Sequence, residues 1–277
     1  MAHQDNALGP GTQANDPAIA GTQVTSMLSV QKRESWRSDT AQSFDHPVLF
    51  WVTRGQGRFM LDCRMRGIGA NTVVYIPPDA LFSYEMFAQP QGMFVTLPQN
   101  DAFKFPDQPL LVKVPSLQAQ AEFNAMIDTL ARELTSERTG RNRAINAQIM
   151  LISVWLDRMR DHLPEEKLRK SDKVLRRFSR VVSIGHRDGK TLGEFAADLN
   201  VTPTHLTRLT QNSVGKPASA LLQERVIHAA CDALRRTDTP VQDVARNLGF
   251  SSAAYFTRAF QHHTGLSPTA FRKSQRK

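Results

Sequence analysis

The sequence contains few of the residues that build disulfide frameworks, and it has no long apolar run. Its two cysteines, Cys63 and Cys231, are far apart and fall in different predicted domains. A structural disulfide is therefore not expected, which fits a reducing cytoplasm. Both side chains are expected to be small buried apolar groups, with a redox switch as the alternative. No stretch of about eighteen apolar residues occurs, so neither a membrane-spanning helix nor a membrane partner is predicted.

Histidine is scarce where a metal site would need it. His46 is the only histidine between Val24 and Pro115, and one histidine cannot build a three-ligand site. The chain also has no nucleophile elbow and no phosphate-binding glycine loop. We therefore predict no catalytic residue, no metal, no cofactor and no enzyme activity.

The chain does contain an internal repeat between Thr191 and Phe271. The segment 198–201, Asp-Leu-Asn-Val, corresponds to Asn-Leu-Gly-Phe at 247–250, and Leu-Thr-Arg at 206–208 corresponds to Phe-Thr-Arg at 256–258. Self-similarity at a fixed period dictates the architecture of a chain. Here it predicts two helix-turn-helix units, at residues 191–212 and 241–264.

The local chemistry of each copy supports this prediction. Each turn needs a residue that tolerates a positive φ, which Gly249 does at no steric cost and Asn200 does next best. Thr202 and Ser252 can cap the following helices through their hydroxyls. Residues 217–236 have apolar positions at helical spacing and would form a rod of roughly 30 Å. Since one turn of B-DNA is about 34 Å, the second helix of each unit could enter successive major grooves.

Four motifs of the second copy carry a family resemblance. They are Gly-Phe-Ser-Ser at 249–252, Tyr-Phe-Thr-Arg-Ala-Phe at 255–260, Gly-Leu-Ser-Pro at 265–268 and Phe-Arg-Lys at 271–273. Together they resemble the C-terminal signature of the AraC/XylS transcription regulators. The first copy departs from the family pattern at Asn200, where glycine is common, and at Thr210, where an aromatic residue is common. The resemblance implies sequence-specific binding of double-stranded promoter DNA, RNA polymerase as a partner, and activation rather than repression.

Positive charge is concentrated in the same half of the chain. From Ser171 onward there are 17 Lys and Arg residues against 8 Asp and Glu, which accounts for the whole net charge of +9. Together with the repeat, this excess indicates attraction to nucleic-acid phosphates. A helix near Lys173 should leave Arg176, Arg177 and Arg180 toward solvent or phosphate. Other expected phosphate contacts are the N-terminal ends of the two reading helices and Lys216, Arg225, Arg246 and Arg272.

Side chains early in the second helix of each unit are expected to read bases. Arg208 is the main candidate, because a guanidinium can pair with O6 and N7 of a guanine. Its equivalent Arg258 could instead bind phosphate or form an internal ion pair, and His205 could be a packing residue. Ala253 and Ala254 offer only methyl contacts, so the second unit is expected to carry less sequence information. The predicted DNA-binding residues are Thr202, Thr204, His205, Thr207, Arg208, Lys216, Ser252, Ala253, Ala254, Thr257 and Arg258.

The region from Val24 to Pro115 is predicted to be β structure, with strands at 48–52, 58–64, 71–76 and 92–97. A turn at 54–57 should join the first two strands as a hairpin. Short strands bounded by Gly and Pro favour a small barrel or sandwich. The Gly-x-Gly turn and Pro77-Pro78 are similar to the cupin-like sensor domain common in AraC/XylS regulators. The expected fold class is α+β, with a cupin-like β-barrel and helices followed by an all-α domain with two helix-turn-helix units.

The barrel interior could be a filled apolar core or a pocket for a small effector. The sequence leaves both open, because a one-residue register error exchanges the two faces of a strand. Trp51, Arg54, Arg58 or Arg64 could meet a carboxylate group of a ligand. The predicted effector-binding residues are Phe50, Val52, Arg54, Phe59 and Tyr75.

Two helices are predicted between the barrel and the repeat. The second has a heptad seam that could pack on its own barrel or on a partner helix. Because such helices often make the dimer contact in the resembled family, we predict a homodimer through Ile145, Ile149, Ile152, Leu156 and Met159.

The expected organisation is a disordered tail at 1–20, an effector-sensing domain at 21–115, dimerisation helices at 116–163, a linker at 164–171 and a DNA-binding domain at 172–277. We therefore expect a cytoplasmic, homodimeric transcription regulator that responds to a small molecule. One alternative is a regulator controlled by a protein partner without a small ligand. The alternative from another class is a cupin enzyme fused to a DNA-binding module.

Overall fold

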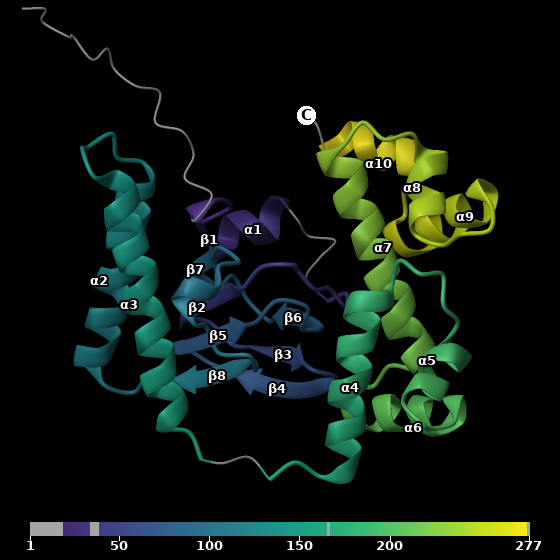
Figure 1. The fold of residues 1–277 in the computed structure, drawn as a ribbon, viewed down its shortest axis with the longest axis horizontal. Coiled ribbons are helices and arrows are strands. Elements are labelled where there is room, and N and C mark those ends of the chain that lie inside the picture. Colours follow the sequence, from purple (N-terminus) through teal and green to yellow (C-terminus); the bar gives the residue numbers. More distant parts are fainter. Residues whose placement is uncertain (1–18, 34–38, 165–166, 276–277) are drawn as a thin grey trace, which may run out of the picture.

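The computed structural model describes residues 19–33, 39–164 and 167–275. Figure 1 shows three parts: a helical hairpin, a β-domain in the middle, and a helical C-terminal domain. The predicted disordered tail lies outside the described residues, except for its last two positions. None of the helices in the described part of the chain is long and apolar enough to cross a membrane.

The β-domain consists of two antiparallel sheets. The larger has the strand order β1-β7-β2-β5-β8 and the smaller has the order β4-β3-β6. Helix α1 (Met27–Arg33) follows the first strand. The strands are β1 (Gln23–Ser26), β2 (Val48–Arg54), β3 (Gly57–Leu61), β4 (Arg64–Ile68), β5 (Thr72–Ile76), β6 (Phe82–Met86), β7 (Gln91–Thr96) and β8 (Leu110–Lys113). The α+β fold class with a β-barrel or sandwich is confirmed.

The pairing of the first two predicted strands is different from the prediction. Strand β2 pairs with β5 and β7, whereas β3 pairs with β4 and β6, so residues 48–52 and 58–64 do not form a hairpin. The chain instead passes from one sheet to the other at Gly55, whose φ of +115° suits glycine alone. The predicted strand 58–64 is itself divided by a tight turn at Asp62 and Cys63, which both have positive φ and join β3 to β4.

The two faces of the larger sheet are both buried, each against a different layer. Phe50, Val52 and Val74 pack toward the smaller sheet. Trp51 and Tyr75, on the opposite face, pack under helices α2 (Leu117–Leu134) and α3 (Arg141–Asp161). This three-layer packing explains why β2 and β5 are apolar at nearly every position, rather than at alternate ones.

The heptad seam of α3 faces the interior of its own chain. Ile145, Ile149, Ile152 and Leu156 are fully buried in the core shared by α2, α3 and the larger sheet, and Met159 packs against that core. The periodicity therefore reports packing on the protein's own barrel and on α2. These side chains are not available for the dimer contact that we predicted from them, because the heptad pattern shows only that one helix face is buried and not what buries it.

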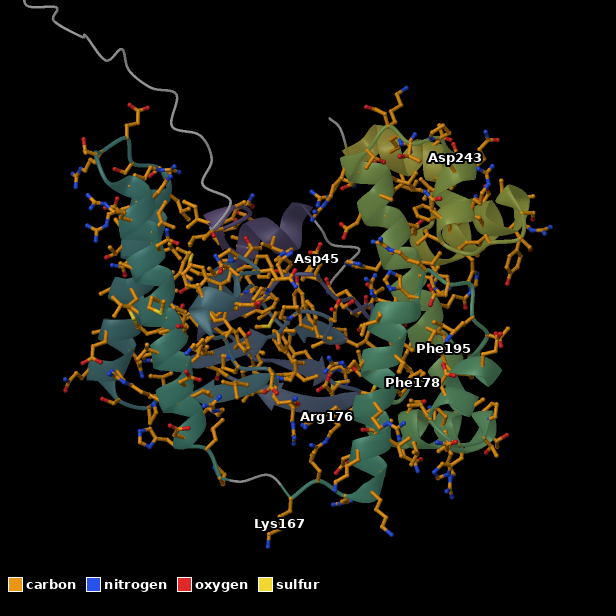
Figure 2. All side chains as sticks on the ribbon, viewed as in Figure 1. Asp45, Lys167, Arg176, Phe178, Phe195 and Asp243 are labelled. Carbon is orange, nitrogen blue, oxygen red and sulfur yellow. The ribbon has the colours of Figure 1, made fainter. Side chains whose placement is uncertain are left out.

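The C-terminal domain is entirely helical, as predicted. It contains α4 (Lys170–Gly185), α5 (Leu192–Asp198), α6 (Pro203–Val214), α7 (Ala218–Arg236), α8 (Val241–Asn247), α9 (Ala253–Thr264) and α10 (Pro268–Gln275). Helix α4 begins at Lys170, within the predicted linker, and lies against the smaller sheet (Figures 1 and 2). Phe178 of α4 shares one hydrophobic core with Met60 and Leu81 of the barrel and with Leu206 of α6. The barrel and the first helical unit are therefore packed together.

Candidate nucleic-acid interface

The two predicted helix-turn-helix units have the same turn geometry. Asn200 and Gly249 end the first helix of each unit with φ values of +55° and +76°. In each turn, the N–H of the following residue donates a 3.0 Å hydrogen bond to an alanine carbonyl, from Val201 to Ala196 and from Phe250 to Ala245. Because both alanines are buried where the helices cross, a larger side chain would separate the helices. The predicted roles of Asn200 and Gly249 in the turns are confirmed.

The second helix of each unit, α6 or α9, has the predicted N-cap. The Thr202 hydroxyl accepts a hydrogen bond of 3.1 Å from the His205 N–H, and the Ser252 hydroxyl accepts one of 3.2 Å from the Tyr255 N–H. Pro203 occupies the start of α6, where it has no hydrogen bond to lose. Both helices end at a glycine with φ near +73°, Gly215 at +74° and Gly265 at +73°.

The start of α6 presents polar side chains to solvent. Thr204 and Arg208 are exposed, and His205 and Thr207 are half-buried. The Arg208 guanidinium lies 3.2 Å from Nδ1 of His205, which holds the two side chains together on the outer face of the helix. Beneath them, Leu206 and Thr210 are buried in the core. The first unit therefore has an apolar face toward the protein and a cationic, hydrogen-bonding face toward solvent.

The start of α9 has a different exposed face. Ala253, Ala254 and Arg258 are exposed, while Thr257 is half-buried and donates to the Ala253 carbonyl. Tyr255 belongs to a family motif but was not among the predicted DNA-binding residues; it is 52% exposed, and its ring lies next to that of Phe250, with centroids 5.8 Å apart. Its position next to buried Phe256 was the available signal, because adjacent residues on a helix point about 100° apart. Tyr255 adds a large side chain with a polar hydroxyl to a surface that otherwise presents the small side chains of Ala253 and Ala254.

The comparisons with known proteins match this region. A helix-turn-helix domain family matches residues 195–274. The Bacillus subtilis HTH-type regulator YfiF is 33% identical over 81 residues, which are 29% of this chain and 26% of that protein. The arabinose operon regulatory protein of Escherichia coli K12 is 31% identical over 81 residues, which are 28% of its length. Residues 195–274 form an AraC-type DNA-binding domain.

The chain spans about a quarter of the length of each of these relatives. The C-terminal domain of AraT from Geobacillus stearothermophilus is 27% identical, over 39% of this chain and 88% of that one, with a TM-score of 0.35. Fatty-acid-bound ToxT from Vibrio cholerae is 12% identical to this chain. The structural alignment covers 91% of this chain and 94% of ToxT, with a TM-score of 0.47.

Several cations of the AraC-type domain that we predicted to contact phosphate have partners within the protein instead. Lys216 donates to the Asp39 carbonyl of the barrel at 2.9 Å and pairs with Glu224 of α7 at 2.6 Å. Arg225 is buried, and its Nε donates to the Ser43 hydroxyl at 2.7 Å. Arg272 donates to the backbone carbonyls of Leu234, in the last turn of α7, and of Thr239, just beyond that helix. Each of these cations forms an intramolecular contact. The number of charges in the sequence does not tell such cations from those that are available to phosphate.

Of the remaining candidates, Arg246 is compatible with phosphate contact, whereas the arginines of α4 lie at the boundary with the barrel. Arg246 is exposed and pairs with Asp243 at 2.9 Å, which leaves most of its guanidinium in solvent. Arg176 faces the barrel instead, with its Nε 3.5 Å from the Asp62 carboxylate (Figure 2). Arg177 and Arg180, on the same helix, line a cavity between α4 and the barrel. The three arginines of α4 therefore belong to the domain boundary.

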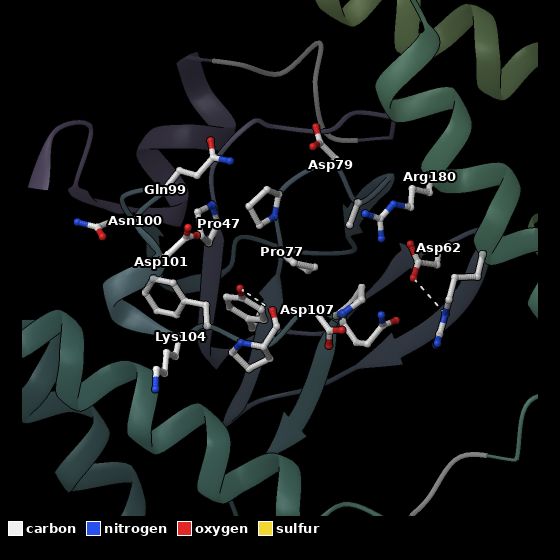
Figure 3. A pocket seen from close by; sticks show the side chains of 18 of the residues that line it. Pro47, Asp62, Pro77, Asp79, Gln99, Asn100, Asp101, Lys104, Asp107 and Arg180 are labelled. Carbon is white, nitrogen blue, oxygen red and sulfur yellow. Dashed lines mark hydrogen bonds and ion pairs between the residues drawn. The ribbon is translucent and has the colours of Figure 1, made fainter. Parts of the chain in front are cut away.

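That cavity has a volume of about 540 Å³ and walls from both domains (Figure 3). One wall is the loop around the short 3-10 helix η3 (Asp101–Phe103), which carries Lys104 and Asp107; the other is α4 with Arg180. Tyr75 is among the lining residues, and its hydroxyl donates to the Pro106 carbonyl at 3.0 Å. Burial, above all, raises the pKa of the Tyr75 phenol, so this group remains a neutral donor.

The five predicted effector-binding residues do not line one pocket. Phe50, Val52 and Phe59 are buried between the sheets, and the rings of the two phenylalanines meet edge to face at 5.0 Å. Tyr75 points to the opposite side of the sheet, and Arg54 is exposed at the end of β2. The prediction combined both faces of the strands, because the sequence does not determine which face is inward. Of the five, Tyr75 alone lines the interdomain cavity.

The other predicted ligands have structural partners. Trp51 donates its indole N–H to the Asn124 side chain of α2 at 2.6 Å. Arg58 pairs with Glu85 across the smaller sheet. Both cysteines are buried, as expected for small apolar residues, and within the described residues neither forms a disulfide. Burial raises the pKa of the Cys63 thiol. Within the described residues, no group of three or more His, Cys, Asp and Glu side chains could hold a metal ion.

Proposed function

We propose that this protein is a sequence-specific transcription regulator that binds two short DNA boxes, one with α6 and one with α9. The observation that carries the proposal is the pair of capped helices with exposed N-terminal turns, joined by the 19-residue helix α7. At 1.5 Å per residue α7 is about 28 Å long. This length is close to the about 34 Å between successive major grooves on one side of B-DNA.

The two units differ in what they can recognise. Arg208 and Thr204 of the first unit can both donate to base edges, and a bidentate guanidinium is the common partner of guanine. In the second unit, Ala253 and Ala254 suit thymine methyl groups, and Tyr255 adds a hydroxyl and a ring. We expect the first unit to specify its box more strictly than the second.

Selection of the purified full-length protein on a library of random DNA duplexes, at near-physiological salt, tests this function. The expected result is enrichment of two boxes about one helical turn apart. Recovery of one box only would mean that α9 contacts the backbone without reading bases. Binding without any enrichment, which simply weakens as salt rises, would contradict the proposal.

The effector site of this regulator is the interdomain cavity, in place of the interior of the barrel. Its volume of about 540 Å³ is within the usual range for small-molecule sites, about 300 to 1,000 Å³. Arg177, Arg180 and Lys104 line it together with Asp101 and Asp107. This mixture favours a small molecule that has an acidic group for the arginines and hydroxyl or amino groups for the loop.

Occupancy of this cavity would couple to DNA binding, because its walls belong to both domains. A ligand that contacts both α4 and the η3 loop binds the docked arrangement of the domains more tightly than the undocked one. It therefore stabilises docking by the difference between these two binding free energies. Activation through contact with RNA polymerase is part of the same proposal, and the similarity of the DNA-binding domain to AraC-type regulators supports it. The alternative, control by a protein partner, predicts that no small molecule stabilises the chain.

Thermal unfolding of the purified protein against a panel of small organic acids tests the effector proposal. An acid that binds is expected to raise the melting temperature of the wild type and of Arg158→Ala, whose side chain is exposed on α3 away from the cavity. The same acid should have little effect on Arg180→Ala. An equal rise in both variants would place the binding site elsewhere.

A homodimer completes the proposed function, through the outer face of α3. Met150, Leu151 and Val154 are 41%, 51% and 38% exposed there, next to one another on the helix. Exposed apolar side chains at this spacing form the kind of stripe that a partner helix covers. The predicted dimer contact is thereby transferred from the buried seam to the opposite face of the same helix.

A further inference from the structure

The two helix-turn-helix units have separate hydrophobic cores. The core of the first unit includes Ala196, Leu206 and Leu221 and continues into the barrel. The core of the second unit is formed by residues of α7 to α10, among them Ile227 and Phe256. Helix α7 belongs to both, with its first turns in one core and its later turns in the other. A single rod between two cores would by itself leave the second unit free to bend or rotate about that rod.

A second contact between the units lies away from α7. The loop between α4 and α5 meets the turn between α8 and α9 at two glycines, Gly189 with φ +67° and Gly249 with φ +76°. A β-carbon on Gly249 would lie 2.3 Å from Cα and 2.4 Å from N of Gly189. One on Gly189 would lie 3.0 Å from the Gly249 carbonyl oxygen. Because the clashing atoms of Gly189 and Gly249 are backbone atoms, no side-chain rotation could relieve the overlap.

The first unit shows that the turn itself does not require glycine. Asn200 occupies the position equivalent to Gly249, with φ +55° and the same hydrogen bonds. Asparagine tolerates this left-handed conformation. The close approach of Gly189 is therefore the reason for glycine at position 249.

We propose that the Gly189–Gly249 contact fixes the orientation of α9 relative to α6, and thereby sets the separation of the two DNA boxes that one chain can bind together. The two glycines are positioning residues, since neither is placed to touch a base. This inference rests on the proposed reading of DNA by both units. With α7 as one connection and the glycine contact as the other, the second unit is held at two separate points.

The energetic consequence lies in the cooperation of the two units. Linking two binding modules raises affinity by about 10²- to 10⁴-fold when their geometry matches both sites, and by nothing when it does not. A side chain at either glycine would push the second unit away from the first and change this geometry. Binding of each unit to its own box would not change.

The test introduces asparagine at glycines that all have a left-handed backbone conformation. Two of these glycines form the close contact, and the third lies away from it. Gly249→Asn introduces a β-carbon against Gly189 while it retains a residue suited to the turn. Gly265→Asn is its matched control, in the same unit at φ +73°, where a β-carbon would have nothing within 4 Å. Gly189→Asn adds the side chain from the first unit and leaves the second unit unaltered. Each full-length variant is selected on the random duplex library and then measured on duplexes with one or both enriched boxes.

The wild type and Gly265→Asn are expected to share one narrow distribution of box separations. Gly249→Asn and Gly189→Asn should broaden or shift that distribution and lose about tenfold or more in affinity for the two-box duplex. Their affinity for a single box should change by less than about twofold.

Unchanged separations and two-box affinity in Gly249→Asn and Gly189→Asn would overturn the inference and leave the proposed function intact. If the wild type enriches no second box, both fail. If Gly249→Asn unfolds the second unit in a thermal melt, Gly189→Asn decides, because its substitution lies in the loop of the other unit.

Discussion

The hydroxyl of Ser179, on the first helix of the DNA-binding domain, donates a 2.9 Å hydrogen bond to the carboxylate of Asp62 at the tip of a barrel hairpin. The same oxygen accepts a 3.2 Å hydrogen bond from the backbone N–H of Leu81. Burial is the main influence on the pKa of Asp62 and raises it, although Ser179 and Arg176 act in the opposite direction. Ser179 thus satisfies two buried barrel groups from the other domain.

Removing this hydroxyl should weaken the contact between the domains. In Ser179→Ala the Leu81 N–H has no partner in that position and the Asp62 carboxylate loses a donor. A buried group left unsatisfied costs about 1–3 kcal/mol, so urea unfolding of the full chain should begin at lower denaturant than in the wild type. Ser219→Ala, on the exposed side of α7, is the control. Equal midpoints in the two variants would mean that the hydrogen bonds at this boundary contribute nothing net.

The side chain of Arg208 should determine one base pair of the first box. Arg208→Lys retains the charge but not the two-pronged donor geometry. It is expected to lose about 1–3 kcal/mol of discrimination at that base pair, while the dependence of binding on salt remains that of the wild type. Competition binding with the matched duplex and its single-base variants measures both quantities. A preserved preference would show that the base is read by another residue.

The exposed leucine on α3 should be required for self-association. Leu151→Glu places a charge in the Met150–Leu151–Val154 stripe and is expected to convert the dimer to a monomer without loss of folding, because Leu151 is half exposed already. Leu117→Glu, on the neighbouring helix and 82% exposed, is the control. Sedimentation of both variants over a range of concentrations distinguishes them. A dimer that survives Leu151→Glu requires a different interface.

Truncation of a side chain in the buried seam should lower folding stability, in contrast to Leu151→Glu, which should affect self-association. Ile149 is fully buried between α3 and the barrel, so Ile149→Ala is expected to cost about 2–5 kcal/mol of folding stability. Chemical unfolding of the Leu151→Glu monomer with and without this second substitution measures the cost apart from association. A loss below about 1 kcal/mol would contradict the burial of the seam against its own chain.

Folding stability should fall on acidification because of His186. Its ring is buried and its Nδ1 lies 2.8 Å from the Ser183 carbonyl oxygen. Burial, followed by the charge of Arg225, lowers the pKa of the imidazole from 6.5 to about 3. The unfolded chain therefore binds the extra proton below about pH 6.5, and stability that is present above this pH is lost as the pH falls toward 3.

Between about pH 7 and about pH 5.5 this loss amounts to about 1 kcal/mol. Urea unfolding at the two pH values measures it. In His186→Gln that part of the pH dependence should disappear, whereas His262→Gln, with an exposed side chain on α9, should retain it. An identical pH dependence in the wild type and His186→Gln would remove His186 as its source.

The sequence alone was sufficient for features that depend on neighbouring residues. The repeat, the turn residues Asn200 and Gly249, and the caps Thr202 and Ser252 were all predictable, because φ preferences and capping hydrogen bonds act over a few positions. The apolar seam of α3 was equally visible as a buried face. These local signals were enough to identify the AraC-type domain.

Tertiary structure decided everything that depends on which surfaces meet. The crossing from β2 to the other sheet, the packing of the α3 seam on its own barrel, and the burial of Arg225 could not be predicted locally. Apolar periodicity and positive charge can be read from the types of residues and from their spacing along the chain. Whether a surface meets solvent, DNA or another part of the same chain is set by contacts between residues far apart in sequence. For this reason Gly189 acquires its place against Gly249 only in the folded protein.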